Sequence, residues 1–224
     1  MSATSTNAAD RPEPFFAEAS GLTLPGVAGL DLAIGPGSGR ALQLHGPAES
    51  GGAVLRALVG LERPLAGTAR LFGVDPAALS RRSARSTLAR VGWLPRQGAL
   101  LANLTLRENL LLPLEFHGQA QGPSRCAAAL ERFGLAEAPD LRPEFAGLAV
   151  RRRVALARAV LLDPALLLLD DPLDDLDEES AAALAAALTA WAGEPGHALL
   201  VTSPDPALAA ALGAARLSIP VTRP

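Results

Sequence analysis

An apolar stretch runs into a glycine-rich turn, and an expected helix follows the turn, within residues 42–55. This is the layout of a phosphate-binding loop, whose motif is G-x-x-x-x-G-K-[ST]. Backbone amides and the lysine hold phosphates in such a loop, and the hydroxyl holds Mg²⁺. Gly46 and Gly51 occupy the two glycine positions, but Gly52 stands at the lysine position and Ala53 at the hydroxyl position. We therefore expect a loop that lacks both the cation and the metal ligand.

Two interpretations of this loop remain open. Its phosphate-binding (Walker A) positions are Gly46, Ser50, Gly51, Gly52, Ala53 and Val54. In the first interpretation, the backbone amides of the three glycines and Ser50 form an anion nest that binds ATP or ADP weakly. In the second, which we favour, the segment is an empty structural turn, because Glu49 would place a carboxylate beside the phosphates. A magnesium ion is expected only if a nucleotide binds.

Composition excludes several classes of protein. The chain has 224 residues, a net charge of −3 and 49% hydrophobic residues, which fits one globular domain. No concentrated basic field stands out, so we do not expect nucleic acid as a partner. Cys126 is the single cysteine, which rules out an internal disulfide and suits a reducing compartment. The sequence has no Lys and no Tyr, so the usual aromatic that stacks on adenine is missing.

The chain alternates between strand-like and helix-like segments. Strands are expected at 40–45, 68–72, 91–94, 166–169, 198–202 and 216–219, with short edge strands within 15–32 and a turn at 34–39. Helices are expected at about 53–61, 75–90, after a capping box at 105–108, at 124–133 and 150–162, from 177 or 178 to 191, and at 205–212. Asp75 is the expected N-cap of the second of these helices.

This order predicts an α/β fold with a parallel sheet core and one inserted group of helices. We expect a disordered tail at 1–14 and a single domain at 15–224, with a helical subdomain at about 103–162. The tail lacks the apolar region of a signal peptide, and no apolar run is long enough to span a bilayer.

The order of these pieces resembles the nucleotide-binding subunit of ATP-binding-cassette (ABC) transporters, from about residue 15 to residue 219. Residues 56–64 with Gly67 are similar to the segment after Walker A, and 91–95 to the approach to the Q-loop. Residues 153–159 are similar to the helix after the signature motif, 166–172 to Walker B and 173–177 to the D-loop. Residues 98–109 are most similar to phospholipid transporters of the Mla type. The resemblance implies a P-loop NTPase-like parallel core with N-terminal antiparallel strands and an inserted α-helical subdomain.

The resemblance also implies roles that the residues here fit poorly. Asp170 stands where the family holds magnesium through water, and Asp171 replaces the general-base Glu with a side chain one methylene shorter. A displacement of that size can cost about 100-fold in rate. Arg96 replaces the glutamine of the Q-loop, although its neighbour Gln97 could still offer a weak metal contact. Ser203 replaces the switch histidine.

The signature motif, which grips the nucleotide of the opposite subunit in this family, is also altered. Its L-S-G-G-Q aligns with residues 146–150, so its contact positions carry Gly147, Leu148 and Ala149. Because both halves of a shared site are altered, we interpret the chain as a pseudo-ATPase. It would act as a structural or regulatory partner in a membrane transport complex, with lipid as the suggested cargo.

This interpretation implies a transmembrane permease and a second ABC subunit, in a homo- or heterodimer, as partners. The chain would then lie in the cytoplasm, on the inner face of the cell membrane, held there by the permease. Two alternatives remain open: a slow but genuine ATPase that energises transport, and a binding module outside transport that uses the same fold.

Overall fold

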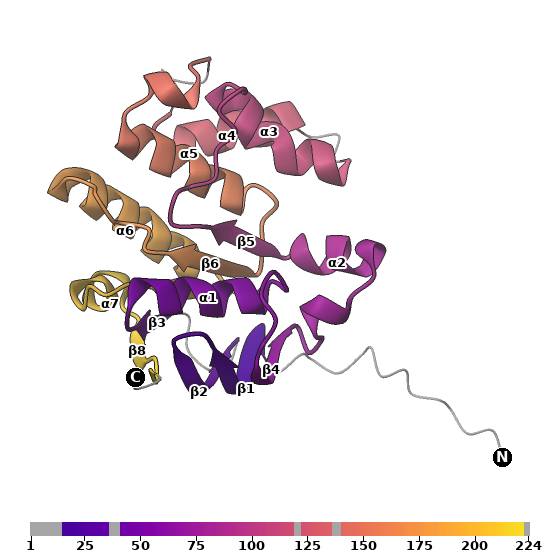
Figure 1. Cartoon of the computed structure of the whole chain (residues 1–224). Coiled ribbons are helices and arrows are strands. Elements are labelled where there is room, and N and C mark those ends of the chain that lie inside the picture. Colours follow the sequence, from indigo (N-terminus) through magenta and orange to yellow (C-terminus); the bar gives the residue numbers. More distant parts are fainter. Residues whose placement is uncertain (1–14, 36–40, 119–121, 136–139, 222–224) are drawn as a thin grey trace.

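Two β-sheets and a group of helices make up the fold (Figure 1). The structure, a computed structural model, describes residues 15–35, 41–118, 122–135 and 140–221. The predicted tail at 1–14 lies outside the described residues, as do residues 36–39 of the predicted turn.

Five parallel strands form the larger sheet, in the order β5-β6-β7-β3-β8. The strands are β3 (Ala41–His45), β5 (Val91–Leu94), β6 (Leu166–Asp170), β7 (Ala198–Thr202) and β8 (Ala215–Ser218). The four leucines of β6 are 0% exposed, and each one buried stabilises the fold by roughly 1.5–3 kcal/mol. The predicted parallel core is therefore confirmed. Because the strands are parallel, the carboxyl ends of β3, β6 and β7 meet at one edge, where the candidate site residues leave the sheet.

Three antiparallel strands form the smaller sheet, in the order β2-β1-β4. They are β1 (Ala17–Leu24), β2 (Val27–Ile34) and β4 (Ala66–Leu71). The prediction of edge strands within 15–32 was right for β2 and wrong for β1, which is the middle strand. Gly21 had suggested a break, but its positive φ of 56° fits the irregular register that β1 shows on both sides.

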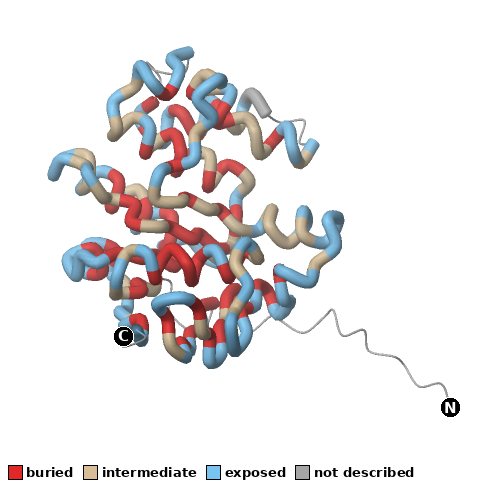
Figure 2. Tube along the Cα trace, in the orientation of Figure 1, coloured by how far each residue is buried: buried red, intermediate tan, exposed pale blue. Residues whose placement is uncertain are grey.

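Helix α1 (Ala48–Leu58) packs between the two sheets, and Val54, Leu55 and Leu58 on it are 0% exposed. The predicted start near residue 53 was wrong, because the helix takes in five residues of the expected loop. The buried residues of Figure 2 are concentrated around α1 and the parallel sheet.

The predicted helix at 75–90 is two elements. Asp75 caps a short 3₁₀ turn (Pro76–Ala78) by accepting from the Ala77 amide at 2.9 Å. Ser80 caps α2 (Arg81–Leu88) by accepting from the Ser83 amide at 3.2 Å. Asp75 is therefore a cap, but not the cap of α2.

Helices α3 (Leu106–His117), α4 (Gly122–Arg132) and α5 (Leu148–Val160) gather at one end of the molecule, with a 3₁₀ turn (Pro143–Phe145) before α5 (Figure 1). The predicted capping box is present: Thr105 accepts from the Glu108 amide at 3.2 Å, and Glu108 accepts from the Thr105 amide at 2.7 Å. Pro113 lies within α3 without ending it. Helices α4 and α5 each start two residues earlier than predicted.

Helices α6 (Glu178–Gly193) and α7 (Ala207–Leu212) complete the fold. Asp177 caps α6, accepting from the Ser180 amide at 2.8 Å, as its position predicted. Among the described residues, no helix has the length and apolar character needed to cross a membrane.

Candidate functional site

The expected phosphate loop is helical. Residues 48–52 form the first turns of α1, and the Gly51 amide donates to the Pro47 carbonyl at 3.1 Å. The Ser50 hydroxyl points away and donates to the Gly26 carbonyl of the smaller sheet at 3.1 Å. A nest needs these amides to converge on one anion outside the helix. The Gly51 amide is therefore used within α1 and is not available to an anion nest, which was the less favoured interpretation of this loop. Glu49, in the first turn, instead offsets the positive end of the helix.

Gly52 stands at the lysine position of the motif, and the side chains of Asp170 and Arg56 lie close to it. A Cβ atom on Gly52 would lie 2.8 Å from Oδ2 of Asp170 and 3.2 Å from NH1 of Arg56. The glycine thus lets the Asp170 carboxylate approach the backbone of α1. Ala53 and Val54, the next positions of the motif, are 4% and 0% exposed and pack in the core. Neither can ligate a metal ion.

Asp170 ends β6 and is held by the neighbouring strand. Its Oδ1 accepts from the Thr202 hydroxyl at 2.9 Å. Thr202 in turn packs on α1, because a Cβ atom on Gly51 would lie only 2.7 Å from the Thr202 Cβ. Among the described residues, no group of three His, Cys, Asp or Glu side chains is arranged to hold a metal ion. Asp170, the carboxylate predicted to hold a metal ion, thus has the Thr202 hydroxyl as its partner and no second acidic side chain arranged with it for a metal ion among the described residues.

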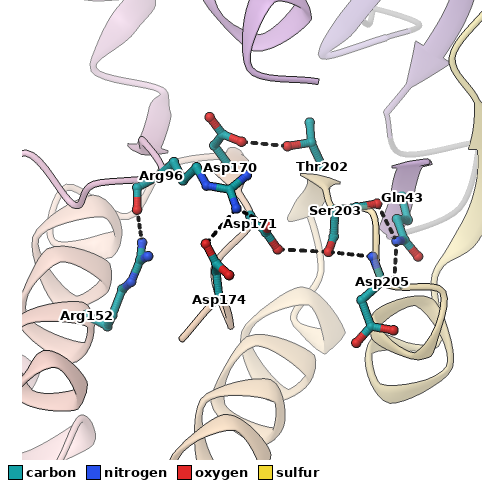
Figure 3. Close-up of polar contacts among 9 residues, drawn as sticks. All are labelled: Gln43, Arg96, Arg152, Asp170, Asp171, Asp174, Thr202, Ser203 and Asp205. Atoms are coloured by element: carbon teal, nitrogen blue, oxygen red, sulfur yellow. Dashed lines mark hydrogen bonds and ion pairs between the residues drawn. The ribbon is translucent and has the colours of Figure 1, made fainter. Parts of the chain in front are cut away.

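Asp171, the general-base position, lies at the centre of a polar network (Figure 3). Asp171 is buried, with 6% of its surface exposed. Its Oδ1 accepts from the Ser203 hydroxyl at 2.8 Å, and its Oδ2 lies 3.1 Å from NH2 of Arg96. The structure thus brings together Asp171 and Ser203, the general-base and switch positions. It uses them to bind each other.

Arg96 supplies the network with a cation. Its NH2 lies 2.6 Å from Oδ2 of Asp174, which makes one guanidinium group bridge Asp171 and Asp174. Burial lowers the pKa of Arg96, but the bond to Asp174 and the nearby carboxylates outweigh it and leave the pKa raised. Burial also raises the pKa of Asp171, while Ser203 and Arg96 act in the opposite direction. The guanidinium group therefore lies directly beside the Asp171 carboxylate and offsets its negative charge.

Helix α5 fixes the segment that carries Arg96. Arg152 of α5 is buried and donates from NH1 to the Arg96 carbonyl. Arg158, six residues after Arg152 on the same helix, donates to the carbonyls of Gly98 and Ala99 at 2.8 Å each. The Q-loop segment is thereby tied to the helical end of the molecule by its backbone and to the carboxylates after β6 by its side chain.

Gln43 holds the loop after β7 from the other side (Figure 3). The side chain is 0% exposed, and its Nε2 donates to the carbonyls of Ser203 at 3.1 Å and Asp205 at 2.8 Å. The Asp205 amide donates to the Ser203 hydroxyl at 3.1 Å. Ser203 is therefore held by Gln43 of β3 and by the loop residues Asp171 and Asp205.

The signature positions lie apart from the phosphate-loop positions. Gly147 is the N-cap of α5 and makes no side-chain cap, while Leu148 and Ala149 form the first turn. Leu148 lines a cavity of about 400 Å³ with Arg151, Arg152 and the D-loop carboxylates. A different cavity, of about 600 Å³, holds Gly52, Arg56, Arg96, Gln97, Glu49 and Asp170 among its lining residues. Arg96 and Gln97 line both cavities, whereas Leu148 lines only the first and Asp170 only the second.

The cavity of about 600 Å³ fits a nucleoside triphosphate poorly. Its two arginines are already paired, Arg56 with Glu62 at 2.9 Å and Arg96 with Asp171 and Asp174. Glu49 and Asp170 add two carboxylates to the same lining. Because phosphates need unpaired donors and positive charge, the residues present do not offer a place for ATP and Mg²⁺.

Sequence reasoning missed three residues of this site. Gln43 is polar within an apolar strand, which is a usable signal for a buried hydrogen-bonding role. Arg56 lies one helical turn after Gly52, and helical side chains point back toward the N-terminus, so its approach to Gly52 could have been foreseen. Thr202 gave no such signal, because its packing on Gly51 depends on how α1 meets β7.

A parallel sheet in this order, with a helix entered directly from the end of β3, defines a domain of the P-loop NTPase class. Comparison with known proteins narrows the class. A profile of the family described as "ABC transporter" matches residues 29–174. The chain therefore belongs to the ABC transporter family.

Relatives and solved structures agree with this assignment. The chain is 34% identical over 189 residues to the lipoprotein-releasing system ATP-binding protein LolD 1 of Rhodospirillum rubrum, covering 82% of each chain. It is 33% identical over 161 residues to the methionine import ATP-binding protein MetN 1 of Rhodococcus jostii, covering 70% of this chain and 48% of that protein. A dimeric ATP-binding cassette bound to ADP and Pi superposes with a TM-score of 0.80 at 21% identity, covering 92% of this chain and 97% of that one. The predicted ABC ATPase fold is confirmed, whereas the Mla-type subgroup stays a prediction.

Proposed function

We propose that this chain is a pseudo-ATPase: an ABC subunit that supports a membrane transport complex without hydrolysing ATP. The observation that carries the proposal is the Arg96 guanidinium group, which bridges Asp171 and Asp174 where catalysis would need a free carboxylate. The helical phosphate loop adds to it, because the Gly51 amide is already used within α1.

The proposal follows from what hydrolysis requires of the site. A general base must accept a proton from a water molecule within hydrogen-bonding distance. Both carboxylate oxygens of Asp171 already have partners, Ser203 and Arg96. Phosphate binding requires donors at Gly52, where the nearest groups are the Asp170 carboxylate and the Glu62-paired Arg56. Binding and proton transfer are therefore both disfavoured.

The relatives support a role in transport. A lipoprotein-releasing protein and a methionine-import protein are both ATP-binding parts of transport systems by name. By analogy, we propose that the chain binds a transmembrane permease and a second ABC subunit, at the inner face of the cell membrane. Lipid or lipoprotein as cargo is supported by the first relative and by the Mla-type similarity at residues 98–109. No nucleic-acid partner is proposed.

A slow but genuine ATPase is the second candidate, and a specific observation favours it. Asp170 and Asp171 remain at the end of β6, and Gln97 lines the cavity that also contains Asp170. A partner subunit would have to supply the missing donors, and Arg96 would have to leave Asp171. A non-transport binding module is the third candidate and rests on fold alone.

The deciding experiment is a titration of the purified chain with MgATP by calorimetry, with a steady-state phosphate-release assay. An active ABC subunit serves as the positive control. We expect no saturable binding up to about 1 mM and no turnover above a buffer blank. Micromolar binding together with turnover by the chain alone would show that the pseudo-ATPase proposal is wrong.

Co-purification from the native membrane tests the transport role separately. We expect a permease and a second ABC subunit to accompany the tagged chain. Their absence, with the chain folded and expressed, would favour the non-transport candidate.

A further inference from the structure

Positive charge is concentrated in one segment of this acidic protein. The net charge of the whole chain is −3, yet no acidic residue occurs between Asp75 and Glu108. That segment carries arginines at positions 81, 82, 85, 90, 96 and 107. The expectation that the chain has no concentrated basic field was therefore wrong for this segment.

Half of these arginines already have contacts that account for them. Arg96 bridges two carboxylates in the candidate site. Arg107 pairs with Asp140 at 3.4 Å, and Arg90 lies 3.6 Å above the Phe72 ring. The remaining ones are Arg81, Arg82 and Arg85, all on α2 and all exposed. Among the described residues, none of these three arginines forms an ion pair.

Helix α2 is a polar surface helix whose three arginines have no acidic partner on the helix itself. None of its eight residues is buried, and it lies at the side of the molecule away from α6 and α7 (Figures 1 and 2). Arg81 and Arg85 are four residues apart, a spacing at which like charges destabilise a helix. Leu88 of α2 is half-buried and packs against the core, but the helix contains no acidic side chain that would balance its arginines. An anionic surface would offset the repulsion.

An exposed aromatic side chain extends this cationic face. Phe116 at the end of α3 is 64% exposed, and the Arg85 guanidinium lies 4.7 Å from its ring centre. The acidic residues that bound the segment, Asp75 and Glu108, are engaged in caps. The face therefore combines exposed guanidinium groups with an exposed apolar ring.

We propose that this face of α2, formed by Arg81, Arg82, Arg85 and Phe116, binds the anionic headgroups of a phospholipid membrane. Arg81 and Arg85 lie on one side of the helix, and Arg82 lies about a quarter turn away, so their charges spread over a broad area. Such an area fits a plane of phosphates, and Phe116 fits the apolar boundary beneath the headgroups. A nucleic-acid duplex has no apolar layer for Phe116, which favours the membrane.

The inference goes beyond the proposed function, because it concerns the chain by itself and needs neither a permease nor a nucleotide. If vesicle binding fails, the pseudo-ATPase proposal is unaffected, since calorimetry and co-purification test that proposal separately.

Co-sedimentation of the purified chain with lipid vesicles tests the proposal. One set of vesicles is phosphatidylcholine alone, and the other contains about 30% phosphatidylglycerol, a fraction that gives a strongly negative surface. We expect binding only to the anionic vesicles, weakening as salt is raised. An arginine near such a surface contributes about 5-fold in affinity, so Arg81→Gln with Arg82→Gln should weaken binding about 25-fold.

The matched control is Arg142→Gln with Arg216→Gln, which removes the same charge at two exposed positions outside α2. Phe116→Ser should weaken binding several-fold without changing its salt dependence. Because all of these positions are exposed, circular dichroism should show an unchanged fold. Equal binding by the two double variants, or binding to duplex DNA but not to anionic vesicles, would overturn the proposal.

Discussion

Replacing Arg96 by glutamine tests whether its guanidinium group stabilises the fold by offsetting the charge of the Asp171 carboxylate. The side chain is 38% exposed, whereas the Asp171 side chain 3.1 Å away is 9% exposed. An exposed ion pair contributes about 0.2–1 kcal/mol, and breaking a buried one costs about 3–5 kcal/mol. This half-buried pair lies between those limits, so we expect Arg96→Gln to cost about 1–2 kcal/mol. In a domain of this size the melting temperature should fall by about 2–8 °C.

The pH dependence makes the test sharper. Burial already raises the pKa of Asp171 in the folded protein, while Ser203 and Arg96 oppose that rise. A carboxyl group whose pKa is higher in the folded than in the unfolded state favours folding at low pH, and that contribution is lost as the pH rises through the folded pKa. Loss of Arg96 should raise the pKa of Asp171 further. The variant should therefore be most destabilised near neutral pH, and the deficit should shrink as the pH approaches the ordinary range of a carboxyl group.

Differential scanning calorimetry of both proteins at neutral and at acidic pH measures these quantities. Arg107→Gln is the control, because Arg107 is 43% exposed and pairs at 3.4 Å with Asp140, which is itself 85% exposed. That pair should contribute at most about 1 kcal/mol. A deficit for Arg96→Gln that equals the control, or that does not change with pH, would refute the reasoning.

Two further predictions follow from the same contacts. Restoring the phosphate-loop residues with Gly52→Lys and Ala53→Thr should not restore MgATP binding in calorimetry, because a Cβ at position 52 would lie 2.8 Å from the Asp170 carboxylate. Binding by that double variant alone, without Arg96→Gln, would contradict the account of the site. Gln43→Leu should cost about 1–3 kcal/mol in urea denaturation, because it removes the side-chain donor from the buried Ser203 carbonyl and from the partly exposed Asp205 carbonyl. An unchanged free energy of unfolding would show that the loop after β7 does not need this residue.

Local signals were enough to predict most of the elements. The leucine run of β6 and the capping box of α3 are read from residues that are neighbours in the chain, and both are present. The boundaries were less accurate where local signals competed. Asp75 and Ser80 are both good caps, and only the structure shows that Pro76–Ala78 separates them.

The candidate site was predicted in part. The residue types at positions 52 and 53, Gly and Ala, carry neither a cation nor an oxygen ligand on their side chains. The sequence did not show that residues 48–52 are helical, because the glycines there suit a loop by propensity and a helix only by packing. Gly51 and Gly52 are buried against Thr202 and Asp170, and this close approach, which a side chain would prevent, is decided by the meeting of α1 with the sheet.

By itself, the sequence determined the order of strands and helices, the family and the residue types at the motif positions. Only the tertiary structure decided what those positions do. Arg96 and Asp174 are distant in the sequence, yet their side chains meet at 2.6 Å because β5 and β6 pair in parallel and end at the same edge. Strand pairing and side-chain reach determine such contacts between distant segments, and neither can be read from local pattern.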